Sequence, residues 1–465
     1  MVQKSAAREK TGNDLGAKSA EAPWETLSPD KKLERRFAAW LAAPGIQFAT
    51  SQAKADYQSR VTNITDALRL KKTPARIPVL PGLGGFAEAY CGYSTYDVMH
   101  DVDKAIDVMN RCTLEFQIDT TVAGNAQSAR QWEILDFKTY IWPGHGLPAD
   151  ADGVQFNEAE YMPVEEYDVF LDDPTDYYWR IYLPRILGSL APLSTLPYLP
   201  YAGQTASVPS SLNVFGRPEI ESALLKLIEA GKEGLKQQQK MAPAARKLTE
   251  LGFPNVGGGN SKAPFDLLGD AFRGTRGIIM DMFKRPEKLM AAMDRLVPIL
   301  IRMGVNSARM GSCPLVGFAL HKGADGYMSD EHFKTFYWGP LRRVCLGLIE
   351  EGLIPRLGAQ GGYNERFEVI RDLPKGKALW ALGYDTDMAK AKAAIGDVAC
   401  LMGNVPATRL HTGTPEETAE FCRHLIDVAG KGGGYIFSTA SIDRNAKVEN
   451  VKAMIKTAKE YGVYS

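Results

Sequence analysis

Short apolar runs alternate with amphipathic segments through the second half of the chain. The apolar runs lie at 314–320, 353–359, 378–383, 398–402 and 434–438. Helical spacing of apolar residues predicts helices at 278–304, 329–352, 365–373, 386–395, 415–430 and 447–461. Continuous apolar strands that alternate with amphipathic helices are typical of a parallel sheet covered by helices.

The first half begins with helical periodicity and then changes to the same alternation. Residues 30–72 have apolar residues at helical spacing. The run 75–82 ends in Pro-Gly and predicts a first buried strand, and a helix near 95–116 leads to a second strand before Asn125. The chain then has about eight strands, which predicts an α/β fold of the (β/α)8 TIM barrel type with an N-terminal helical arm, whereas five or six would make an open sheet.

Residues 135–215 break this alternation. They contain many Pro, Tyr and Asp residues and little helical periodicity, so we expect a long insertion with short strands and irregular loops. Segments of this kind are usually functional, and we expect it to form a lid or an interface at the carboxyl-end face of the barrel. We therefore divide the chain into an N-terminal arm and helix at 1–60 and a barrel at 61–465, with the insertion at about 135–215.

Composition excludes several classes of function. The 55 Lys and Arg residues balance 55 Asp and Glu residues, which argues against partners such as nucleic acid or an anionic membrane. No apolar run approaches the roughly 18 residues of a membrane span. The six cysteines form no CxxC pair, which predicts reduced thiols, a cytoplasmic location and no tightly bound metal. The dinucleotide and P-loop glycine motifs are missing from the sequence.

Active sites of parallel barrels lie at the carboxyl ends of the strands, so the polar residues that follow each apolar run are the candidates. We predict three catalytic residues, His321, Asp325 and Asp385. We predict the following substrate-binding residues: Glu88, Tyr90, Asn125, Lys322, Gln360, Asn364, Tyr384, Asn404 and Ser441.

Each candidate also has a structural alternative. His321 could cap its strand, Lys322 could be a solvated loop lysine, and Asp325 could form a turn beside Gly326. One of Asp385 and Asp387 is expected to serve the N-terminus of the following helix.

The C-terminal half carries a family resemblance. The pieces HKGADGYMSDEHF, GYDTDMAKAKAAIGDVACLMGNVP, HTGTPEETAEFCRHLID and GGGYIFSTASIDRNAKVENVKAMIKTAKEYG occur in this order between 321 and 462, and TPARIPVLPG begins the first strand. This series resembles the uroporphyrinogen decarboxylase superfamily. The resemblance implies a (β/α)8 barrel and covers most of residues 60–465, least clearly at the insertion.

The resemblance implies two chemistries: cofactor-free decarboxylation, and methyl transfer that involves a corrinoid (cobalamin) on a partner protein or a thiol. Decarboxylases of the family carry an arginine-rich motif after the first strand, and residues 82–88 contain no arginine. Thiol methyltransferases bind zinc through H-x-C and a later cysteine, where this chain has Arg356-Leu357-Gly358 or Gln360-Gly361-Gly362, and then Thr439-Ala440-Ser441.

Within the superfamily, the sequence thus resembles the corrinoid-dependent demethylating methyltransferases more than the other branches. The expected activity is transfer of a methyl group from a small O-, N- or S-methylated substrate to cobalamin on a corrinoid-binding protein. A homodimer is among the expected assemblies. In this branch Asp325 or Asp385, oriented by His321, would protonate the leaving heteroatom. The alternatives are a cofactor-free decarboxylase of uroporphyrinogen or a smaller acid, and a binding protein that kept the barrel without the chemistry.

Overall fold

The computed structural model describes residues 22–123, 127–197, 205–309, 311, 313–439 and 441–464. Within this part of the chain the main sheet is parallel throughout. Its strands, in spatial order, are β4 (Gly259–Asn260), β5 (Leu315–Leu320), β6 (Ile354–Ala359), β7 (Leu379–Leu382), β8 (Cys400–Val405) and β9 (Tyr435–Thr439). Spatial order equals chain order, as in a singly wound barrel.

Extended segments from the first half of the chain close this sheet into a ring. Val79 forms a parallel bridge with Phe437 of β9. The backbone N–H of Asp119 then donates to the carbonyl of Val79 at 3.0 Å, and that of Thr121 donates to Pro254 at 3.2 Å. Pro254 leads into β4, so the segments at Val79 and Thr121 complete the (β/α)8 barrel, and the predicted fold class is confirmed.

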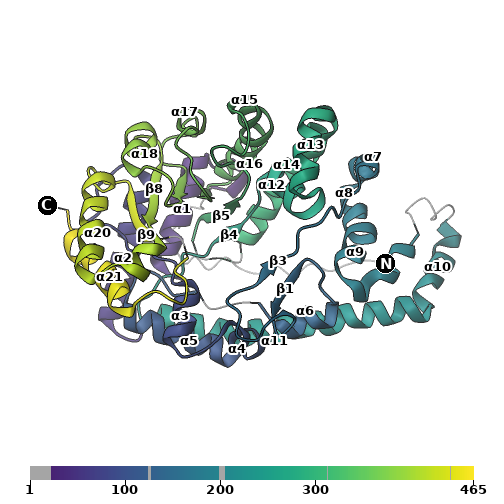
Figure 1. Ribbon diagram of the computed structural model, residues 1–465, viewed down its shortest axis with the longest axis horizontal. Coiled ribbons are helices and arrows are strands. Elements are labelled where there is room, and N and C mark those ends of the chain that lie inside the picture. Colours follow the sequence, from purple (N-terminus) through teal and green to yellow (C-terminus); the bar gives the residue numbers. More distant parts are fainter. Residues whose placement is uncertain are drawn as a thin grey trace, which may run out of the picture.

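Helices cover the outside of the C-terminal strands (Figure 1). In chain order they are α12 (Pro264–Leu267), α13 (Gly274–Lys284), α14 (Pro286–Ala308), α15 (Asp330–His332), α16 (Gly339–Glu350), α17 (Phe367–Ile370), α18 (Met388–Ile395), α19 (Ala407–Thr412), α20 (Pro415–Ala429) and α21 (Val448–Tyr461). The helix predicted at 278–304 is two helices, because Arg285, with φ −146° and ψ 45°, leaves the helical conformation and Pro286 then starts a new helix.

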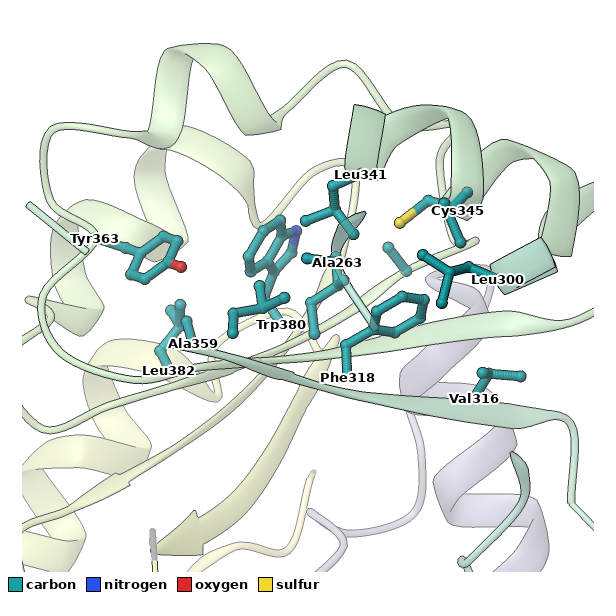
Figure 2. Close-up of a cluster of buried hydrophobic side chains, with 14 of the residues drawn as sticks. Ala263, Leu300, Val316, Phe318, Leu341, Cys345, Ala359, Tyr363, Trp380 and Leu382 are labelled. Atoms are coloured by element: carbon teal, nitrogen blue, oxygen red, sulfur yellow. The ribbon is translucent and has the colours of Figure 1, made fainter. Parts of the chain in front are cut away.

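Alternation along the strands decides which side chains meet these helices. On β5, Val316 and Phe318 point towards Leu300 of α14 and Cys345 of α16 (Figure 2). Burial of such side chains contributes roughly 1.5–3 kcal/mol each. The alternate residues of β5, which include Gly317 and Ala319, therefore face the barrel interior.

Two helices close the amino end of the barrel. They are α1 (Pro29–Ala42) and α2 (Ser51–Arg69), whose Trp40 and Tyr57 pack with Leu315 and Ile354, near the beginnings of β5 and β6. The single helical region expected at 30–72 is interrupted because Ala43 adopts φ 45°, a left-handed conformation that ends α1. The carboxyl end is thus the open end of the barrel.

The remaining elements lie between the first strand and β4. They are α3 (Gly84–Tyr90), α4 (Thr95–His100), α5 (Val102–Phe116), α6 (Ala129–Leu135), β1 (Tyr140–Pro143), β2 (Gly146–Leu147), β3 (Gln155–Phe156), α7 (Tyr167–Asp172), α8 (Pro174–Asp176), α9 (Leu183–Ile186), α10 (Val208–Ser211) and α11 (Pro218–Glu250). The strands β1–β3 form a small sheet. Figure 1 shows α7–α10 and the far part of α11 extending beyond the barrel.

The segment 135–215 differs from the expectation of irregular loops, because short helices follow its strands. Aromatic packing explains them, since Tyr177 of this segment contacts both Phe170 and Phe272. The segment meets the carboxyl-end loops: Asp152 forms an ion pair with Arg444, which follows β9. The domain boundaries themselves remain predictions.

Candidate functional site

Asp266 on α12 holds the end of strand β5. Its carboxylate is fully buried and accepts hydrogen bonds from the backbone N–H groups of His321 and Lys322, both at 3.0 Å. The hydroxyl of Tyr337 donates a third bond at 2.7 Å. Burial raises the pKa of Asp266 to about 6, against the opposing effect of the Tyr337 hydrogen bond. This carboxyl group therefore fixes the backbone that presents His321.

Asp270 orients the side chains that follow. It lies on a π-helical turn, η8 (Leu268–Phe272), and its carboxylate contacts Nδ1 of His321 at 2.6 Å and Nζ of Lys322 at 2.7 Å. Burial alone would raise the pKa of Asp270, but the hydrogen bonds from His321 and Lys322 outweigh it and lower the pKa to about 2. Because Nδ1 of His321 is engaged, Nε2 is the nitrogen that can meet a ligand, and the side chain is 32% exposed. We call Asp266, Asp270, His321, Lys322 and Tyr337 the β5 cluster.

A second group of predicted residues joins the loops after β5, β6 and β7. The backbone N–H of Asp325 donates to Gly362 at 2.7 Å, and its Oδ1 accepts from the N–H of Glu365 at 3.2 Å. The same oxygen lies 3.7 Å from Nε of Arg366, which is almost fully buried. The carboxylate of Asp325 is thus engaged in holding two loops together.

Asn364 and the aspartates after β7 complete this group. The Asn364 amide donates to the carbonyl of Asp385 at 3.0 Å and accepts from the N–H of Asp387 at 2.8 Å. Asp387 caps α18, as one of the two aspartates was expected to do. A Cβ added at Gly362 would lie 3.4 Å both from Oδ2 of Asp325 and from the carbonyl of Asp385. We call Asp325, Gly362, Asn364, Asp385 and Asp387 the loop cluster.

The other candidates after β6, β7 and β8 differ in exposure. Asn404 is buried, and its amide donates to the carbonyls of Gly383 and Thr386 at 3.0 and 2.7 Å, so it shapes the β7 loop. Tyr384 is 61% exposed. Gln360 is exposed, and its backbone N–H donates to the end of β5.

Glu88 and Ser441 share a cavity of about 330 Å³ at the same end of the barrel. It is lined by Gly85, Glu88, Thr95, Gln127, Asp152, Gly153, Val154, Ser441, Ile442, Asp443 and Arg444. The Thr95 hydroxyl donates to Glu88 at 2.9 Å. Tyr90 lies apart from this cavity, because its ring packs on Phe86 and Phe116 in the helical layer. Asn125 lies outside the described residues.

Sequence reasoning missed Asp266 and Asp270. The strand before them, β4, has only two residues in a glycine-rich stretch, so its carboxyl end was not recognised. The available signal was the spacing of the two aspartates, which places them one helical turn apart.

Two further properties concern metals and membranes. Among the described residues, no three His, Cys, Asp or Glu side chains gather closely enough to bind a metal ion together. Within the same part of the chain, no helix has the length and apolar character needed to cross a membrane.

The sequence of this chain is similar to those of known proteins. The sequence profile "Uroporphyrinogen decarboxylase (URO-D)" matches residues 222–461, just over half of the 465 residues. A uroporphyrinogen decarboxylase of Methylococcus capsulatus is 28% identical over 139 residues, which are 29% of this chain and 39% of that protein. One from Saccharophagus degradans is 25% identical over 209 residues, 44% of this chain and 54% of that protein. The chain thus spans about half or less of these curated relatives.

A solved structure resembles the whole barrel. It is a methyltransferase from Methanosarcina mazei, with 14% sequence identity and a TM-score of 0.53, and the match covers 86% of this chain and 98% of that one. At this identity the likeness shows the fold.

Proposed function

The chain belongs to the uroporphyrinogen decarboxylase family, and from this premise we propose that it transfers a methyl group from a small O-, N- or S-methylated substrate to cobalamin carried by a partner protein. The methyltransferase from Methanosarcina mazei has the same fold, which is compatible with this activity.

The observation that carries the proposal is the pairing of three cations that follow the barrel strands at the open end. Lys322 binds Asp270, Arg444 binds Asp152, and Arg366 binds Asp330. Uroporphyrinogen has eight carboxylates. A protein that binds them needs several unpaired cationic side chains that can form bidentate hydrogen bonds. The segment 82–88, where family decarboxylases have arginines, contains none. The charges at this end therefore favour a smaller substrate.

The β5 cluster supplies the proton in this proposal. A phenolate or alkoxide leaves poorly unless it is protonated, so a donor must face the heteroatom that loses the methyl group. His321 meets this need through Nε2, while Asp270 holds its other nitrogen and Lys322 balances the charge of Asp270. Asp325 and Asp385 remain the alternative acids.

Cobalamin, carried by the partner, would supply a reduced cobalt as nucleophile. The chain's own part is to bind the substrate, to orient the methyl group towards the open end and to protonate the leaving group. Two small residues near the strand ends, Ala319 and Gly358, point inward and leave the interior accessible to solvent. This is compatible with cobalamin approaching the substrate from the open end of the barrel.

An anaerobic assay tests the proposal. The purified chain is mixed with reduced cobalamin and a panel of methoxy, methylamine and methylthio compounds, and formation of methylcobalamin is followed by absorbance. We expect methylation with at least one small substrate, and a loss of rate in His321→Ala. Release of carbon dioxide from uroporphyrinogen or a smaller acid, without methyl transfer, would replace the proposal with the decarboxylase alternative. That alternative is supported by the similarity of this chain to uroporphyrinogen decarboxylases of other organisms.

A further inference from the structure

A guanidinium group lies inside the barrel. Arg356, in the middle of β6, is opposite Gly317 of β5, which is opposite Asn260 of β4. Residues opposite one another on neighbouring strands point to the same face of a sheet. Because Val316 and Phe318 face the helices in Figure 2, this row faces the interior. A Cβ added at Gly317 would lie 3.0 Å from Oδ1 of Asn260 and 3.3 Å from Nη2 of Arg356, so glycine at 317 leaves room for both side chains.

Among the described residues, Arg356 has no carboxylate partner, unlike two buried arginines near the open end of the barrel. Arg273 binds Asp281 through Nε at 2.6 Å, and Arg366 binds Asp330. For the partly buried Arg356, the described part of the chain offers neither a hydrogen bond nor an ion pair. Removing a charge from water without a counter-charge costs free energy. A ligand with a negative group would offset that cost.

Space for such a ligand lies between Arg356 and the open end. The next inward positions are Ala319 on β5, Gly358 on β6 and Ala381 on β7, which are register neighbours. Ala319 is exposed to solvent and the other two are partly exposed, although all three face the barrel interior. Large side chains at these inward positions would fill a barrel of this size. Glycine and alanine here leave the upper interior open to solvent.

We propose that Arg356 binds the carboxylate of a small methylated carboxylic acid, which enters the barrel with its carboxylate first. This inference rests on the proposed function and narrows its substrate class. A guanidinium matches a carboxylate with two parallel hydrogen bonds, and the Asn260 amide can donate a third. From Gly317 to His321 is four residues, about 13 Å along a strand. The guanidinium and the bound carboxylate occupy part of this distance. The remainder leaves room for about one aromatic ring between the carboxylate and His321.

Equilibrium binding tests the inference without any partner protein. Isothermal titration calorimetry compares benzoate and 4-methoxybenzoate with neutral methoxybenzene and with inorganic phosphate. We expect the two carboxylates to bind the wild-type protein, and Arg356→Gln to weaken them about ten- to hundredfold, the worth of a charged hydrogen-bonded pair. Arg371→Gln, which removes an exposed arginine paired with Asp397, is the matched control and should bind as the wild type does.

Two outcomes of this titration would overturn the inference. One is carboxylate binding that is undetectable in the wild type or equal in Arg356→Gln. The other is phosphate binding more tightly than either carboxylate, because a tetrahedral anion would then be the ligand.

A folding control separates ligand binding from a structural role. Arg356→Gln removes no bond within the described residues, so its unfolding temperature without ligand should equal or exceed that of the wild type. A clear decrease would make Arg356 a structural residue and end the proposal. Arg356→Lys keeps the positive charge but loses the paired N–H donors of the guanidinium. Its affinity for the carboxylates should lie between those of the wild type and Arg356→Gln.

Failure of the inference and failure of the proposed function give different results. If 4-methoxybenzoate is demethylated equally by the wild type and by Arg356→Gln, the methyltransferase stands and the carboxylate site falls. If carboxylates bind through Arg356 and no methyl transfer occurs with any substrate of the panel, the site stands and the methyltransferase falls.

Discussion

Two sets of polar residues lie at the open end of the barrel, and they use their side chains differently. In the loop cluster, the side chains of Asp325 and Asn364 bind backbone groups of neighbouring loops, and that of Asp387 caps its own helix α18. In the β5 cluster, a buried carboxylate holds the backbone, and a second carboxylate holds one edge of the imidazole of His321. The other edge of that imidazole stays available to a ligand.

Polar residues at strand ends can be ranked by the groups that hold their side chains. A residue type that suits catalysis is equally suited to fixing a loop, since both uses need the same hydrogen bonds. What separates the two clusters is a supporting group. Asp270 orients His321 and leaves it a vacant nitrogen, whereas in the loop cluster the side chain itself is the support.

The largest effect is expected from His321→Ala. If His321 is the general acid, turnover should decrease by ~10²–10⁴-fold, while the apparent affinity for substrate changes little. Steady-state kinetics of demethylation with an ether substrate measures both. A quaternary amine substrate is a useful control, because its leaving group needs no proton and should respond less. Full activity with the ether would remove His321 from the reaction and return the role to Asp325 or Asp385.

The second prediction concerns acid stability and Asp270. Its pKa in the folded protein, about 2, is below the value of about 3.9 expected for an unfolded chain. The folded state therefore binds fewer protons, and the carboxylate stabilises the fold above pH ~4 and loses this contribution as the pH falls towards 2. Asp270→Asn should be less stable than the wild type by about 2 kcal/mol at pH 6, with the difference shrinking below pH 4.

Urea unfolding at pH 6 and pH 3 measures this difference. Asp385→Asn is the matched control, because the contact of Asp385 with Asn364 uses its backbone carbonyl. Its effect on the unfolding free energy should be small. A stability difference for Asp270→Asn that stays constant between the two pH values would contradict the assignment of the ion pairs to Asp270.

A smaller effect is expected in the loop cluster. Asp325→Ala removes the acceptor for the Glu365 N–H and a long contact with Arg366, and we expect a loss of about 1 kcal/mol of unfolding free energy. Turnover per folded molecule should change far less than in His321→Ala. A decrease in kcat of a hundredfold or more with unchanged stability would reverse the ranking of the two clusters.

The sequence predicted most of the barrel and only part of the site. Strand and helix positions after residue 314 were legible because each strand is a continuous apolar run bounded by polar residues, as at 315–320. The strand β4 was not legible, since a two-residue strand that begins at the last of three consecutive glycines has no apolar period. The partners Asp266 and Asp270 follow β4 and were therefore missed, and the interior position of Arg356 becomes visible only through strand register.

The smallest predicted effect is that of Tyr384→Phe, and it tests whether the β7 side of the open end touches substrate at all. The phenol is 61% exposed, and no hydroxyl partner for it exists in the described part of the protein. Removing the hydroxyl should therefore change the unfolding free energy by less than about 0.5 kcal/mol, as for most surface substitutions. A change in KM then reports a contact with substrate rather than damage to the fold. One neutral hydrogen bond is worth about 0.5–1.5 kcal/mol, so we expect KM to rise roughly two- to tenfold with kcat unchanged. If KM stays within experimental error of the wild type, Tyr384 makes no such bond, and substrate recognition moves to the β4–β6 side, where Arg356 and His321 lie.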